Sequence, residues 1–113
     1  MSDLALHFED RDPSVAASYR AILTAARKFG PVKEEPKKTS IHLVSRTAFA
    51  GIATRKSALI LTLKSNRDIR SARIIKHEQA SANRWHLDVR VERASEVDGE
   101  LIGWVRAAYE MSS

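Results

Sequence analysis

The first clear pattern along the chain is helical and runs from residue 13 to residue 28. Asp12 is a favourable N-cap, and Pro13 suits the first helical position. Gly30 can adopt the conformation that ends a helix, and Pro31 cannot continue one. The pattern predicts an amphipathic helix with one apolar stripe, made of Val15, Tyr19, Ile22, Leu23 and Ala26.

The middle of the chain alternates between apolar and polar residues, which is typical of strands with one buried and one solvated face. Five segments show this pattern or a small apolar variant of it: residues 40–44, 47–53, 58–64, 71–78 and 84–93. The alternation is clearest in the third segment, where Leu59, Leu61 and Leu63 share a face. The links at 54–57 and 80–83 are short enough for hairpins, so we expect an antiparallel sheet.

A second helix is predicted near the C-terminus, over residues 96–111. Ser95, followed three positions later by Asp98, resembles a capping box at its start. The order of elements predicts an α+β fold with an N-terminal helix, an antiparallel sheet of four to six strands and a C-terminal helix. Both helices are expected on one face of the sheet. Residues 12–113 are predicted to form a single domain, preceded by a flexible N-terminus over residues 1–11.

The same patterns predict which side chains form the core. We expect ten residues to be mostly buried: Tyr19, Ile22, Leu23, Phe49, Leu61, Leu63, Leu87, Val89, Leu101 and Val105. Trp85 alternates with Leu87 and Val89, which favours a core position over an exposed ring that stacks on nucleic-acid bases.

Several segments, in order along the chain, together resemble a known family. They are EPKKTSIHL, FAGI, LILTLK, SANRWHLDVRV and a final helix that ends in AAYE. Over residues 12–110 the chain resembles a bacterial domain of unknown function, family 5655, which is sometimes labelled a predicted transport protein. The resemblance implies a small α+β domain that occurs alone or beside domains of restriction and nuclease systems. It implies no established activity and no catalytic residues.

Composition narrows the class of protein. The 113 residues include no cysteine, which excludes disulfides and thiolate metal sites. The N-terminus lacks the basic region and apolar run of a signal peptide. No segment approaches the roughly 20 apolar residues that a membrane span requires. We therefore expect a soluble cytoplasmic protein with no membrane partner.

The segment Glu35-Pro36-Lys37 matches half of a metal-dependent nuclease signature, in which a carboxylate binds Mg²⁺ and a lysine helps to activate water. The match is poor, because proline is disfavoured in a central strand. The aspartate that should precede it on a strand is also missing, since Asp12 lies at a helix start. We interpret residues 34–56 as an edge and first hairpin with solvated charges, and we keep a nuclease-like enzyme as the least favoured alternative.

Histidines and acids on the polar side of the strands are candidates for a metal or acid–base cluster: His42, His77, His86, Glu78 and Asp88. His86 and Asp88 lie two positions apart on one strand, so they share a face and are chemically able to co-ligate a divalent metal. The chain has no HxH or HExxH motif and no phosphate-binding glycine loop. We therefore expect no metal, no cofactor and no catalytic residue.

Charge is distributed unevenly along the chain, which has a formal net charge of +5. Residues 33–93 carry 14 Lys and Arg against 6 Asp and Glu, whereas the flanks are mildly acidic. Such asymmetry favours an anionic partner, because Lys and Arg neutralise phosphates and release counterions. Eight residues are candidates for binding nucleic acid or another polyanion: Lys37, Lys38, Arg46, Arg55, Lys56, Lys64, Arg84 and Arg90.

A protein-interaction or homodimerisation module is the alternative function. Unpaired edge strands can pair with a partner chain, and Trp104 is expected to be half-exposed near the last helix. The sequence therefore predicts a non-catalytic binding module, with nucleic acid and a second copy of the chain as the candidate partners.

Overall fold

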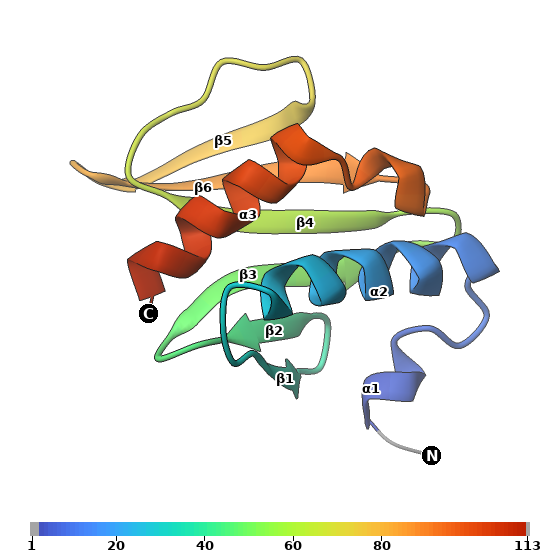
Figure 1. Cartoon of the computed structure of the whole chain (residues 1–113). Coiled ribbons are helices and arrows are strands. Elements are labelled where there is room, and N and C mark those ends of the chain that lie inside the picture. The colour runs from blue at the N-terminus through green and yellow to red at the C-terminus, as the bar shows by residue number, and fades with distance from the viewer. Residues whose placement is uncertain (1–2, 113) are drawn as a thin grey trace.

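In the computed structural model, which describes residues 3–112, three helices accompany one six-stranded sheet (Figure 1). The helices are α1 (Asp3–Leu6), α2 (Pro13–Arg27) and α3 (Gly99–Ser112). The strands are β1 (Lys33–Pro36), β2 (Ile41–Val44), β3 (Ala48–Thr54), β4 (Leu59–Ser65), β5 (Ile74–Ser81) and β6 (Arg84–Val91). The predicted α+β fold with an antiparallel sheet of four to six strands is confirmed.

Neighbouring strands in the sheet follow the order β1-β2-β3-β4-β6-β5, and every pair is antiparallel. The first four strands form a meander, whereas β6 inserts between β4 and β5 and leaves β5 at the edge. The predicted hairpins after β3 and β5 are both present. Helices α2 and α3 lie side by side across one face, as Figure 1 shows, and no helix of residues 3–112 covers the opposite face.

The core lies between this sheet and the two long helices. All ten residues predicted to be buried are buried, with exposures of 8% or less. In β4 the exposure alternates residue by residue, so Leu59, Leu61 and Leu63 face the helices. Fully burying one such side chain contributes about 1.5–3 kcal/mol, and this periodic burial fixes which face of each strand is covered.

The two edges of the sheet differ. Strand β1 is a four-residue edge that ends at Pro36, where a missing N–H does little harm. Its Glu34 is not solvated as predicted: the carboxylate faces the helices, accepts a 2.6 Å hydrogen bond from the Tyr19 hydroxyl and pairs with Arg27 at 3.3 Å. Burial, together with the bond to Glu34, raises the pKa of Tyr19. Glu34 therefore ties edge strand β1 to α2.

The start of α3 differs from the prediction, and the proposed Ser95 capping box is wrong. Ser95 lies in a 3₁₀ turn (Ala94–Glu96), and α3 begins only at Gly99. Asp98 caps the helix instead, because its carboxylate accepts a 3.1 Å bond from the Leu101 N–H. Arg73 donates to Asp98 at 2.9 Å, and these two bonds hold the Asp98 pKa below its usual value.

The N-terminal segment runs beside one end of the sheet. After α1, the His7 ring lies 2.8 Å from the Lys37 carbonyl, and the His7 carbonyl accepts a bond from the Thr54 hydroxyl. Asp12 occupies the predicted N-cap position of α2, although its side chain makes no capping bond. The expected flexibility of residues 1–11 stays a prediction, and residues 1–2 lie outside the described chain. No helix within residues 3–112 is long and apolar enough to cross a membrane.

Candidate functional site

The face of the sheet opposite the helices, here called the open face, carries polar side chains at regular positions. Strand register places one row of neighbours across it, namely Glu35, His42, Gly51, Thr62 and Asp88. Lys64 and His86 form a second pair of neighbours toward one end. The predicted alternation of β6 is confirmed, since His86 and Asp88 share this face.

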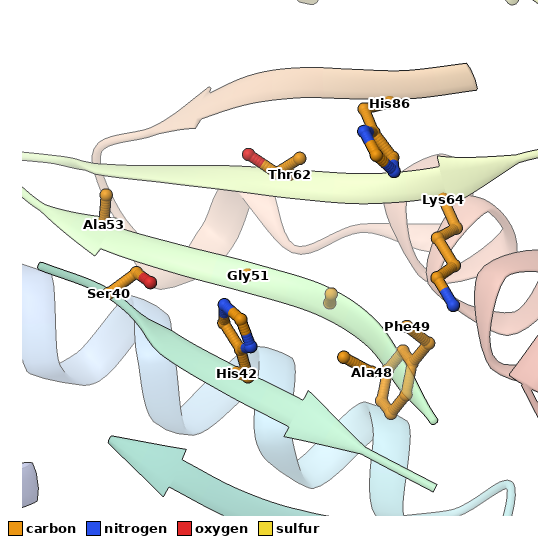
Figure 2. Close-up of a pocket in the computed structure, with 10 residues that line it drawn as sticks. Ser40, His42, Ala48, Phe49, Gly51, Ala53, Thr62, Lys64 and His86 are labelled. Carbon is orange, nitrogen blue, oxygen red and sulfur yellow. The ribbon is translucent and has the colours of Figure 1, made fainter. Parts of the chain in front are cut away.

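A hollow of about 300 Å³ lies in the open face. Its floor is β3, where Ala48, Gly51 and Ala53 are too small to fill the space between neighbouring strands. Figure 2 shows His42 on one side of this floor, with Lys64 and His86 on the other. The hollow thus combines a small apolar floor with polar and basic walls.

Two basic side chains, Lys64 and Arg84, lie near each other at one end of the sheet, and Lys64 lines the hollow. Lys64, which lines it, donates to the Thr47 and Ser112 hydroxyls at 3.3 Å each. Partial burial and the positive charge of Arg84 lower the pKa of Lys64. The Nε atom of Arg84 is buried and has no hydrogen-bond partner among residues 3–112. A positive charge with an unsatisfied donor is thus held beside a second positive charge.

The acids near these residues are already engaged. Glu78 lies 3.5 Å from the ring of His86. Asp88 accepts a 2.6 Å hydrogen bond from the Thr62 hydroxyl. The positive charges of Lys64 and Arg84 have no carboxylate partner among the ion pairs of residues 3–112.

The candidate histidine cluster is not assembled. His42 and His86 border the hollow from β2 and β6. His77, in contrast, lies on β5, and its ring is 2.5 Å from the carboxylate of Asp68 in the loop before that strand. Within residues 3–112, no three His, Asp or Glu side chains gather in a way that would hold a metal ion.

The eight predicted polyanion-binding residues divide between the two ends of the sheet. Four lie in the turns after β1 and β3, which the antiparallel order places at the same end; we call Lys37, Lys38, Arg55 and Lys56 the turn cluster. Arg90 lies on the open face toward that end, opposite Ile60, and pairs with Glu92 at 3.3 Å. The remaining three, Arg46, Lys64 and Arg84, lie at the opposite end and are called the hollow cluster.

Contacts in the turn cluster involve mainly backbone. Lys37 pairs with Glu35 at 3.5 Å, and both side chains are substantially exposed. Lys56 donates to the Asp10 carbonyl at 3.2 Å, and Arg55 donates to its neighbour's carbonyl. Glu35 thus lies on an exposed edge beside Lys37, and no group of potential metal ligands forms around it within residues 3–112.

The hollow, the orphaned Arg84 Nε and the role of Glu34 were missed by sequence reasoning. A signal for the hollow exists in the sequence: β3 places Ala48, Gly51 and Ala53 among larger residues of β2 and β4. Side-chain direction on β1 identifies Glu34, but only after the register with β2 is known. The orphaned nitrogen has no sequence signature, because it depends on packing between strands.

The chain belongs to the family described as "Domain of unknown function (DUF5655)", whose model matches residues 5–112. The match extends beyond the predicted residues 12–110 and includes most of the N-terminal segment. No curated protein and no solved structure matches the chain.

Proposed function

We propose that this domain is a non-catalytic module that binds nucleic acid through the open face of its sheet. The observation that carries the proposal is the placement of two basic clusters at opposite ends of the sheet, one face of which no helix of residues 3–112 covers. The anionic partner expected from the charge asymmetry would then lie along the strands, with the turn cluster at one end and the hollow cluster at the other.

The spacing of the two clusters suits a nucleic-acid backbone. Strand β4 has seven residues, and at about 3.4 Å per residue it spans roughly 20 Å. One strand of duplex DNA carries a phosphate about every 3.4 Å along the axis. A duplex whose axis follows the strands therefore has about six phosphates of each DNA strand along this length, which is enough to reach from one cluster to the other.

Phosphate contact is a better explanation than base stacking for such binding. All seven Phe, Tyr and Trp side chains belong to the core or pack against it, including Trp85 and Trp104. The open face thus lacks the aromatic platform on which single-stranded binding proteins stack bases. Since phosphate contacts position a protein without specifying sequence, binding should be nearly independent of base sequence.

Fluorescence anisotropy with DNA and RNA oligonucleotides over a series of salt concentrations tests the proposal. Four phosphate contacts predict a slope of log K against log salt of about −3.6 for duplex DNA, and about −2.8 for single strands. Replacing Lys37 and Lys38 by Gln should reduce the size of the duplex slope by about 1.8.

The matched control removes two positive charges from α2 and its C-cap residue, on the other side of the sheet. Arg20 and Lys28 are both exposed there, so Arg20→Gln with Lys28→Gln should leave the slope unchanged. If both double variants reduced the slope equally, binding would depend on the net charge of the protein and not on a particular face. Absence of binding to any oligonucleotide at low salt would refute the proposal.

Self-association through β5 is the second candidate function. Ile75 on this edge strand is 57% exposed, and seven of the eight β5 residues are exposed. Two register irregularities against β6 disturb the edge, which disfavours pairing with another chain. A dimer in sedimentation equilibrium that Ile75→Lys dissociates, in a protein that binds no nucleic acid, would favour this candidate.

A further inference from the structure

We infer that the hollow in the open face is a binding site for a terminal phosphate group, such as the 5′-phosphate of a nucleotide or of a nucleic-acid end. The inference rests on the proposed function and adds to it a defined position and a ligand class. It starts from the hollow of about 300 Å³ over Gly51, which Lys64 lines, and from Arg84, which lies outside the lining but near Lys64.

Arg84 supplies the first argument. It precedes His86 by two positions on β6, so the two side chains leave the strand toward the same face. The Arg84 Nε donor is buried and unsatisfied within the described chain. Leaving a buried donor without an acceptor is costly, and more so when the group is charged. A phosphate oxygen, like a carboxylate oxygen, is an acceptor that a guanidinium binds strongly.

Lys64 supplies the second argument. Hydroxyls of Thr47 and Ser112 hold its ammonium group at the end of the hollow, where Figure 2 shows it directed toward Ala48 and Phe49. Its lowered pKa reports that burial and Arg84 disfavour its charge in the free protein. A bound anion would relieve this repulsion.

The hollow itself indicates the kind of phosphate. Its volume is at the lower end of the range of about 300–1,000 Å³ found for small-molecule sites. The floor of Gly51 and Ala53 leaves room for a sugar or base beside the phosphate. A monoester at a chain end also carries more negative charge than an internal diester. Two adjacent cations without a carboxylate partner among the ion pairs of residues 3–112 match that larger charge.

The test compares two oligonucleotides of the same sequence that differ only in a 5′-phosphate or a 5′-hydroxyl, using wild-type protein at moderate salt. We expect about tenfold tighter binding of the phosphorylated oligonucleotide, since its terminal phosphate adds about 1.5 to 2 negative charges near two cations. The double variant Lys64→Gln with Arg84→Gln should abolish this preference. The double variant Lys37→Gln with Lys38→Gln should weaken the binding of both oligonucleotides and preserve the preference for the phosphorylated one.

A second measurement separates this inference from the proposed function and needs no variant. Phosphorus NMR with 5′-AMP, and proton NMR with adenosine as its control, report whether the nucleotide binds through its phosphate. Equal binding of both oligonucleotides and no interaction with AMP would overturn the inference and leave the proposed function standing. Binding of AMP but not of any oligonucleotide would support the phosphate site and refute the nucleic-acid module.

Discussion

At the scale of single residues, two neighbouring glutamates on β1 have different roles. Glu34 faces α2, where its carboxylate bonds Tyr19 at 2.6 Å and pairs with Arg27 at 3.3 Å. Glu35 faces the other way and makes a 3.5 Å pair with the exposed Lys37. Glu34 is therefore a structural carboxylate and its neighbour Glu35 a solvated one, because successive side chains of a strand alternate between faces.

These two residues provide a matched pair of variants. Glu34→Gln should lower the free energy of unfolding by about 1–2 kcal/mol, because it removes the charge that both partners recognise in a partly buried site. Glu35→Gln should change it by less than about 0.5 kcal/mol, as expected for an exposed ion pair. Urea unfolding followed by circular dichroism measures both. Equal effects, or a larger effect at Glu35, would contradict the assigned roles.

The difference between Glu34 and Glu35 also shows which features of the fold can be predicted from the sequence. Both acids were predicted to be solvated, because the short KEEP segment has no apolar alternation that would indicate a buried face. The helix-facing position of Glu34 follows from pairing of β1 with β2 and from the approach of Tyr19, which is 15 residues away in sequence. Local patterns carry no information about such a contact.

At the scale of secondary-structure elements, Gly30 joins α2 to β1 in a conformation that other residues rarely adopt. Its φ is +151°, and an added Cβ would overlap the hydroxyl of Tyr109 on α3. That hydroxyl donates to the Pro31 carbonyl at 3.1 Å. The loop therefore fixes how the end of α2 meets α3.

We predict opposite effects for two glycine substitutions. Gly30→Ala should destabilise the fold by about 2 kcal/mol through backbone strain and the displaced Tyr109. Gly103 lies exposed on α3, and an added Cβ there meets nothing within 4 Å, so Gly103→Ala should stabilise by up to about 1 kcal/mol. Thermal unfolding of the two variants beside wild type measures both changes. A stabilised Gly30→Ala protein would contradict the described packing.

Elements with strong periodicity were predicted well, and elements fixed by distant contacts were not. The alternation of β4 and β6 and the stripe of α2 identified their buried faces directly. The start of α3 was misplaced because Ser95 and Asp98 both have capping side chains. The contacts of Asp98 with Arg73, 25 residues away, accompany the true start. The position of β5 outside β6 is likewise a property of long-range pairing.

At the scale of the whole molecule, the positive charge of residues 33–93 is divided rather than continuous. Four of the eight predicted residues lie in the turns at one end of the sheet, and three lie at the other end, where Lys64 lines the hollow. The antiparallel strand order brings Lys37, Lys38, Arg55 and Lys56 to the same end of the sheet. Local sequence patterns do not predict that Lys64 and Arg84 lie near each other, because the strand that pairs with β4 is β6 and not β5, which follows β4 in sequence.

The central claim is that the open face is the surface that contacts nucleic acid. Chemical-shift mapping of ¹⁵N-labelled protein at low salt, with increasing amounts of a short duplex DNA, tests it most directly. The proposal predicts the largest shifts at backbone amides around the hollow and along the open face, including His42, Gly51, Thr62, Lys64 and His86, with small shifts in α2 and α3. Shifts concentrated on α2 and α3 or on the β5 edge, or no shifts at all, would contradict it.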